Sequence, residues 1–190
     1  MADTTAPIAG GKRQEIIDQA YKLFYDGGFH ATGVDAVMAG TGISKRTLYK
    51  YFPSKEHLIE AVLEHYGSGV EASLFGPALA RSDDPRRQIL AIFDVRRELM
   101  ESSRCLGCLA MKAAQEYRGR HAGIEETGRR SSQMIEDRLE ALCAKAGLAR
   151  ARETARQIAL VLQGAVLTSQ MRGDTEVFPD AKAVVQKLLD

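Results

Sequence analysis

Apolar side chains recur at helical spacing along most of the chain. Within residues 12–26 they fall on one face of a predicted helix, and Gly27-Gly28 then ends the pattern. Two shorter apolar patterns follow, one ending at residues 40–42 and one lying between Ser44 and Pro53. The sequence therefore predicts a longer helix followed by two short helices joined by a tight turn.

Helical patterns also fill the rest of the chain. Ser54 is suited to cap a helix that runs to about Tyr66, before four glycine and proline residues between 67 and 77 loosen the periodicity. Asp83-Asp84-Pro85 favours another helix start, because acidic groups stabilise the positive end of a helix. Further patterns lie near residues 86–101, 105–118, 122–146, 151–172 and 180–190. With no convincing strand, the prediction is an all-α fold of about nine helices.

The composition is that of an ordinary globular protein, with 45% apolar residues, 27% charged residues and a net charge of +1. No apolar run approaches the roughly 18 residues that a membrane span needs, and the N-terminus has no signal-peptide pattern. We therefore expect a cytoplasmic protein with no membrane partner. The three cysteines, an odd number, indicate reduced thiols.

Positive charge is concentrated in residues 44–55, called the basic segment below. This segment carries four basic residues and no acidic one, whereas residues 1–66 together carry 7 Lys plus Arg and 8 Asp plus Glu. At 100° per residue, Leu48 and Phe52 share one helix face, and the polar side chains lie on the other. A helix that packs on one side and is basic on the other is suited to nucleic-acid phosphates.

The flanks of the basic segment add to this interpretation. Gly42 allows a sharp turn before the segment, and Ser44 can accept a hydrogen bond from the first free amides of the helix. Hydroxyl groups that can bind phosphate occur at Ser44, Thr47, Tyr49 and Tyr51. Lys55 opens the next helix, whose positive end can meet the same phosphate.

In order and spacing, this region resembles the N-terminal signature of TetR-type repressors over about 45 residues. The matching residues are Gly28-Phe29, Thr32, Val34, Val37, Gly42-Ile43-Ser44, Thr47-Leu48-Tyr49, Tyr51-Phe52, Lys55 and Leu58. The chain departs from the usual pattern at Thr41, where alanine is common, and at Tyr51, where histidine is commonest; both changes keep size or hydrogen bonding.

The resemblance implies double-stranded operator DNA as a partner and assigns the contacts. Thr32, Tyr49, Tyr51 and Lys55 would hold phosphates. Lys45, Arg46, Thr47 and Lys50 would face bases or the nearby backbone, with Ser44 at the start of the same helix. Lys12 and Arg13 are further candidates at the start of the first predicted helix.

The resemblance also implies a homodimer formed by the last two helices. Small residues in 151–172 would let helices approach closely, and larger apolar residues would fill the seam between subunits. The predicted interface residues are Ile158, Leu162, Ala165 and Val166. These helices carry more apolar surface than a monomer of this size would leave in water.

A small-molecule effector is the third implied partner. Side chains that would surround a cavity in the resembled fold are Phe93, Met100, Cys108, Met111, Tyr117 and Met134. Methionine adapts to varied ligands, but a methionine-rich stripe is more often plain core. The pattern does not identify a particular ligand.

The cysteines leave alternatives open. Cys105 and Cys108 form a Cys-Leu-Gly-Cys pattern that suits a redox pair, but a second pair that would make a zinc site is missing, and Cys143 is distant. Cys108 also fits an apolar helix face as a small buried side chain. The four histidines show no ligand spacing, and nucleophile-elbow and phosphate-loop motifs do not occur, so we expect no metal, no cofactor and no enzymatic activity.

Together these patterns predict a flexible arm at residues 1–11, a helix-turn-helix DNA-binding domain at 12–54 and a helical effector-binding and dimerisation domain at 55–190. The expected function is sequence-specific operator binding, with repression relieved by an effector. One alternative is control by a protein partner or by thiol oxidation. Another is a helical binding module or enzyme without DNA, which would require the basic segment to be buried.

Overall fold

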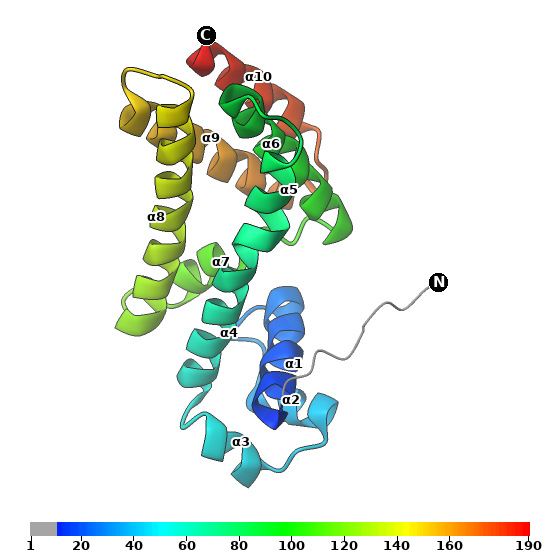
Figure 1. The fold of residues 1–190 in the computed structure, drawn as a ribbon. Helices are drawn as coiled ribbons and strands as arrows, with labels where there is room; N and C mark the ends of the chain where they lie inside the picture. Colours follow the sequence, from blue (N-terminus) through cyan, green and yellow to red (C-terminus); the bar gives the residue numbers. More distant parts are fainter. Residues whose placement is uncertain (1–10) are drawn as a thin grey trace. The chain divides into compact units, whose positions relative to one another are not determined.

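A computed structural model of the protein describes residues 11–190, and all regular structure in this range is helical (Figure 1). The predicted all-α class is confirmed. The arm expected at residues 1–11 lies outside the described residues except for Gly11, which immediately precedes the first helix. The chain forms two compact units: the first ends at His65, and the second runs from Tyr66 to Asp190.

The first unit contains α1 (Lys12–Gly27), α2 (Val34–Thr41), α3 (Lys45–Tyr51) and the first part of α4 (Lys55–Val70). Each helix contributes fully or nearly fully buried apolar side chains to a small common core. The largest in this unit are Ile16, Phe24, Phe29, Leu48, Phe52, Leu58, Ile59 and Leu63. The rings of Phe24 and Phe29 lie 5.1 Å apart between centroids, which fixes the turn that follows α1.

The unit boundary lies beyond the boundary predicted after residue 54, because α4 packs against α1. Leu58 and Val62 are fully buried in α4. At the end of this contact, Nε2 of His65 lies 3.7 Å from Oδ1 of Asp18, and the His65 ring meets Tyr21 edge-on. Because of these contacts, the first part of α4 belongs to the first unit together with the three helices predicted from the sequence.

Helix α4 also continues further than the sequence predicts. It passes through Gly67 and Gly69, a π-helical turn (Glu71–Phe75) follows, and α5 (Gly76–Leu79) completes the run without a break. Tertiary packing overrides the weak helix propensity of glycine here, since Leu74, Phe75 and Ala78 are buried. With this run taken as one helix, residues 11–190 hold nine helices, as expected.

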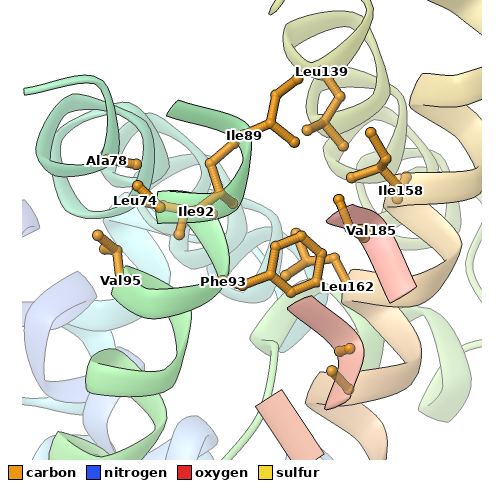
Figure 2. Close-up of a cluster of buried hydrophobic side chains, with 14 of the residues drawn as sticks. Leu74, Ala78, Ile89, Ile92, Phe93, Val95, Leu139, Ile158, Leu162 and Val185 are labelled. Atoms are coloured by element: carbon orange, nitrogen blue, oxygen red, sulfur yellow. The ribbon is translucent and has the colours of Figure 1, made fainter. Parts of the chain in front are cut away.

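The second unit also contains α6 (Pro85–Ser102), α7 (Leu109–Glu116), α8 (Ala122–Lys145), α9 (Ala151–Arg172) and α10 (Val177–Leu189). Asp84 caps α6, as predicted, by accepting a hydrogen bond of 2.9 Å from the Arg86 amide. The core of this unit lies between α6, α8, α9 and α10, where Phe93, Leu139, Leu162 and Val185 meet (Figure 2). Along residues 11–190 no helix is long and apolar enough to cross a membrane.

Candidate nucleic-acid interface

The turn between α2 and α3 depends on Gly42. Its φ of 65° lies in the left-handed region, and its amide donates a 2.8 Å hydrogen bond to the Met38 carbonyl at the end of α2. A Cβ atom at this position would meet nothing within 4 Å. Backbone conformation, and not space, therefore favours glycine here.

Helix α3 begins with the predicted side-chain cap. Oγ of Ser44 accepts a hydrogen bond of 3.1 Å from the Thr47 amide, and the hydroxyl oxygens of Ser44 and Thr47 lie 2.9 Å apart. Both side chains are thus engaged in starting the helix. The cap holds α3 in place and leaves the remaining polar side chains of the basic segment to face outward.

The predicted two-sided character of α3 is confirmed by burial. Leu48 is fully buried and Phe52 is 2% exposed, whereas Tyr49 and Tyr51 are each 39% exposed. The basic side chains of the same helix, Lys45, Arg46 and Lys50, are exposed. Arg13 of α1 adds a contact that the sequence did not reveal, since its guanidinium lies 5.1 Å from the centre of the Phe52 ring.

Within residues 11–190, the cations of the basic segment have no acidic partner. Among the described residues, no ion pair involves any of Lys45, Arg46, Lys50 and Lys55, in contrast to Lys12, which lies 3.0 Å from Glu15. Unpaired charge on one short exposed helix produces a local positive field although the whole chain is nearly neutral. Such a field is what phosphate attraction requires.

Lys55 is the first residue of α4 and is half-buried. Ser54, just before it, caps this helix as predicted, because its Oγ accepts a 3.3 Å hydrogen bond from the His57 amide. The Lys55 ammonium is therefore attached to a capped helix start whose amide dipoles also attract anions.

Thr32 does not fit its predicted role as a phosphate contact. It is 7% exposed, and its hydroxyl donates a hydrogen bond of 3.2 Å to the Leu23 carbonyl of α1. A hydroxyl has one proton, so this bond leaves none for a phosphate oxygen. Through this hydrogen bond, Thr32 instead connects the residues before α2 to α1.

The residues predicted to contact an effector are distributed over several environments. Phe93 and Met100 are fully buried core side chains, which favours the plain-core interpretation for these two. Tyr117 is 4% exposed, and Cys108, Met111 and Met134 are half-buried. A polar pocket of about 230 Å³ lies elsewhere, between α8 and α9, and is lined by Gln133, Glu136, Glu140, Arg152, Ala155 and Arg156.

The four residues predicted at the dimer interface lie in the core of the chain itself. Ile158, Leu162, Ala165 and Val166 are at most 5% exposed and pack with α6, α8 and α10. Figure 2 shows Ile158 and Leu162 among the side chains of this core. Residues that the single chain already buries cannot line a seam with a second chain, so the predicted positions are corrected.

A different apolar surface remains exposed on the last two helices. Leu160 is 72% exposed, Leu167 41% and Met171 80% on α9, and Val184 is 47% exposed on α10. Gly164 lies between them on α9, exposed and with open space around its Cβ position. We name Leu160, Gly164, Leu167 and Met171 the exposed α9 face. Their helical spacing of four, three and four residues was a signal available in the sequence.

Comparisons with known proteins agree with this geometry. Residues 16–62 match the family model described as bacterial regulatory proteins, tetR family. The HTH-type transcriptional activator FasR of Mycolicibacterium smegmatis is 30% identical over 90 residues, which are 47% of this chain and 41% of FasR. The HTH-type transcriptional repressor ComR of Escherichia coli is 41% identical over 54 residues, 28% of this chain and 26% of ComR.

The matched parts thus span less than half the length of these curated relatives. Among solved structures, SCO4454, a TetR-family transcriptional regulator from Streptomyces coelicolor, superposes with a TM-score of 0.83 at 24% identity over 93% of both chains. This likeness extends the shared fold to the second unit. Residues 16–62, from α1 to α4, thus carry the N-terminal region of the tetR family of bacterial regulatory proteins, and the chain shares the fold of a TetR-family structure.

Proposed function

We propose that the protein is a sequence-specific DNA-binding transcription regulator that places α3 in the major groove of operator DNA. The observation that carries this proposal is the exposed α3 surface, where three basic side chains that have no acidic partner among residues 11–190 stand beside two exposed tyrosines. The alternatives without DNA predicted a buried or masked basic segment, so the exposure of Lys45, Arg46 and Lys50 supports the DNA-binding proposal. The match of residues 16–62 to the tetR family model supports the same proposal.

We propose that the residues that contact DNA form two groups, one at the phosphates and one at the base edges. Tyr49, Tyr51 and Lys55 bind phosphates and fix the position of the helix on the duplex. Arg46 and Lys50 approach base edges, with Lys45 and Thr47 beside them. Thr32 has no part in this set, because its hydroxyl is already bonded within the chain.

Binding to operator and scrambled duplexes across a salt series tests this division, with the operator first selected from random DNA. Lys55→Ala removes one phosphate contact, so we expect weaker binding to both duplexes and a salt slope smaller by about one. Arg46→Ala is expected to cost about 1–3 kcal/mol on the operator alone and to relax preference at one base pair per half-site. Lys22→Ala, at an exposed lysine of α1 outside the basic segment, is the matched control.

Two outcomes would contradict the assignment. If Lys55→Ala and Lys22→Ala change both affinities equally, the start of α4 does not lie on DNA. If Arg46→Ala weakens operator and scrambled duplex to the same extent, Arg46 contacts backbone and not a base.

We also propose that the regulator acts as a homodimer through the exposed α9 face and Val184 of α10. Isolated apolar side chains are common on protein surfaces, but a row of them at helical spacing along one helix is typical of an interface. Two subunits related by symmetry would present two copies of α3 to half-sites about one helical turn of DNA apart.

Control of binding is proposed to act through a small-molecule effector, with operator release and repression as the expected direction. Met111, Tyr117 and Met134, on or beside α7 and α8, are the proposed contacts. An effector shifts operator affinity only if it binds the two states of the protein differently. A thermal-shift screen followed by operator titration tests this: a ligand that stabilises the protein and weakens operator binding is the expected result.

A further inference from the structure

Two thiols lie in a strained loop between α6 and α7. Arg104 and Cys105 have φ values of 53° and 59°, in the left-handed region that side chains other than glycine rarely occupy, and Gly107 has a φ of 86°. The Cys105 amide is held by a 2.7 Å hydrogen bond to the Met100 carbonyl at the end of α6. We call residues 103–108 the thiol loop. Its backbone strain favours rearrangement once a contact that holds it is lost.

Cys108 is the accessible thiol of this loop. It is half-buried and directly precedes α7 as the N-cap residue. The Tyr66 hydroxyl donates a hydrogen bond of 3.5 Å to its sulfur. The Tyr66 hydroxyl and the first turn of α7 are therefore the polar groups next to this sulfur.

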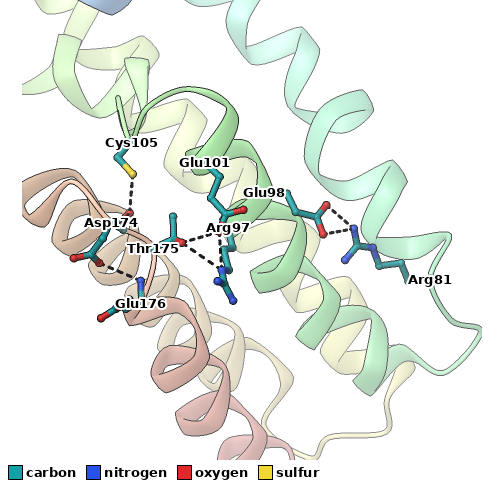
Figure 3. Close-up of polar contacts among 9 residues, drawn as sticks. Arg81, Arg97, Glu98, Glu101, Cys105, Asp174, Thr175 and Glu176 are labelled. Carbon is teal, nitrogen blue, oxygen red and sulfur yellow. Dashed lines mark hydrogen bonds and ion pairs between the residues drawn. The ribbon is translucent and has the colours of Figure 1, made fainter.

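Cys105 is buried and connects the loop to the turn between α9 and α10 (Figure 3). Its sulfur lies 3.6 Å from the hydroxyl oxygen of Ser169, a fully buried residue of α9 that also contacts the Asp174 carbonyl. The Ser169 hydroxyl donates toward both the Cys105 sulfur and the Asp174 carbonyl, so it connects the thiol loop to the turn. A Cys105 sulfur that turns toward Cys108 to form a disulfide leaves this contact.

Further hydrogen bonds continue from the same turn to α6. Thr175, next to Asp174, donates a hydrogen bond of 2.7 Å to the Glu101 carboxylate, and Arg97 donates to the same carboxylate at 2.9 Å (Figure 3). The thiol loop itself is held by Arg96, which donates to the Gly107 carbonyl at 2.9 Å. The state of the Cys105 sulfur is therefore coupled to the corner that joins the last two helices.

We propose that Cys105 and Cys108 form a hydroperoxide-reactive modification site whose oxidation to a disulfide loosens the α9–α10 turn. The Cys108 sulfur attacks one peroxide oxygen, the O–O bond breaks, and water or an alcohol leaves, which gives a sulfenic acid. The Cys105 thiol then attacks this sulfur, the S–O bond breaks, water leaves, and the S–S bond forms. Two electrons pass from the two sulfurs to the peroxide, and the Cys105 proton is lost.

The third thiol supplies an internal control. Burial, followed by the charge of Glu140, raises the pKa of the Cys143 thiol to about 11. At neutral pH this cysteine remains protonated and unreactive toward peroxide, because the thiolate is the nucleophile. Reaction confined to the thiol loop is therefore distinguishable from general oxidation of the protein.

Peptide mapping under non-reducing conditions, after hydrogen peroxide treatment of the full chain, tests the chemistry. We expect one intramolecular link between Cys105 and Cys108, reversed by dithiothreitol, while Cys143 stays free. Cys105→Ser keeps an acceptor for the Ser169 hydroxyl but cannot form the link, so this variant should stop at modified Cys108. Two free thiols in oxidised wild type, or links only between chains, would overturn the proposal.

Hydrogen exchange at residues 173–176 tests whether oxidation of Cys105 loosens the α9–α10 turn. Oxidised wild type should exchange these amides faster than reduced protein, and reduced Ser169→Ala should resemble it because the contact to Cys105 is gone. Unchanged exchange after verified disulfide formation would refute the coupling.

The regulatory consequence rests on the proposed DNA-binding function. Oxidation should weaken operator binding of wild type by at least about tenfold and leave Cys105→Ser unaffected. Undiminished operator binding by the verified disulfide form would overturn this consequence. If reduced wild type binds no duplex at all, the proposed function fails, while the mapping and exchange results still decide the modification site.

Discussion

Leu160 and Leu162 provide a direct test of which face of α9 meets a second chain. They are the same residue type, two positions apart on one helix, but Leu160 is 72% exposed and Leu162 is 4% exposed. Replacing each by alanine should therefore give different defects. Leu160→Ala should weaken the dimer and leave the fold intact, whereas Leu162→Ala should destabilise the fold.

The structure sets the size of both effects. Leu→Ala removes about three CH₂ equivalents, worth about 2.4 kcal/mol when fully buried. If the interface covers the 72% of Leu160 that one chain leaves exposed, the loss is about 1.7 kcal/mol per copy. A symmetric dimer contains the residue twice, so the dimer loses about 3.5 kcal/mol, or about 300-fold in dissociation constant. Leu162→Ala should instead lower the free energy of unfolding by about 2–5 kcal/mol.

Sedimentation equilibrium over a dilution series measures the dimer, and urea unfolding of the dissociated chain measures the fold. Gln157→Ala, an exposed polar position of the same helix, is the control for helix effects. An unchanged dissociation constant for Leu160→Ala would show that the exposed α9 face is not the interface. A stable Leu162→Ala chain that no longer dimerises would instead restore the interface inferred from sequence.

Three further outcomes follow from local geometry and chemistry. Gly42→Ala should cost about 1–2 kcal/mol, because φ is 65° there, and Gly42→Asn should cost less; urea unfolding measures both. The hydrogen bond from the Thr175 hydroxyl, followed by that from Arg97, lowers the pKa of Glu101. The ionised Glu101 carboxylate therefore stabilises the fold above the ordinary glutamate pKa, and this stabilisation is lost as pH falls through the lowered pKa. Thr175→Val should therefore flatten the fall of Tm on acidification. Iodoacetamide should label Cys143 last of the three thiols at neutral pH, as peptide mapping would report.

The first unit could be predicted in detail because its signals are local. The Ser44 and Ser54 caps and the Gly42 turn each act within three or four residues. The separation of Leu48 from Tyr49 follows from helix geometry alone. Thr32 was different, because its hydroxyl bonds to a carbonyl nine residues away, and the sequence does not reveal that partner.

The second unit was less predictable because its helices carry apolar residues on more than one face. In α9, Ile158 and Leu162 alternate around the helix with Leu160 and Leu167. Periodicity shows that such a helix has apolar surfaces, but it does not show which of them the chain covers with its own α6 and α10. The extension of α4 through Gly67 and Gly69 escaped prediction for a related reason, since packing and not propensity maintains it.

The exposed α9 face and the thiol loop meet at one end of α9, which connects the two proposals for this chain. Ser169, the contact of Cys105, lies two residues before Met171, and Gly173 then ends the helix. A loosened turn at this end would displace Met171, which is 80% exposed and belongs to the proposed interface. In a dimer that binds two half-sites, the interface sets the spacing of the two copies of α3. Oxidation at Cys105 and Cys108 would therefore change operator affinity without altering any residue of the basic segment, so oxidised protein should lose affinity for the operator more than for scrambled duplex.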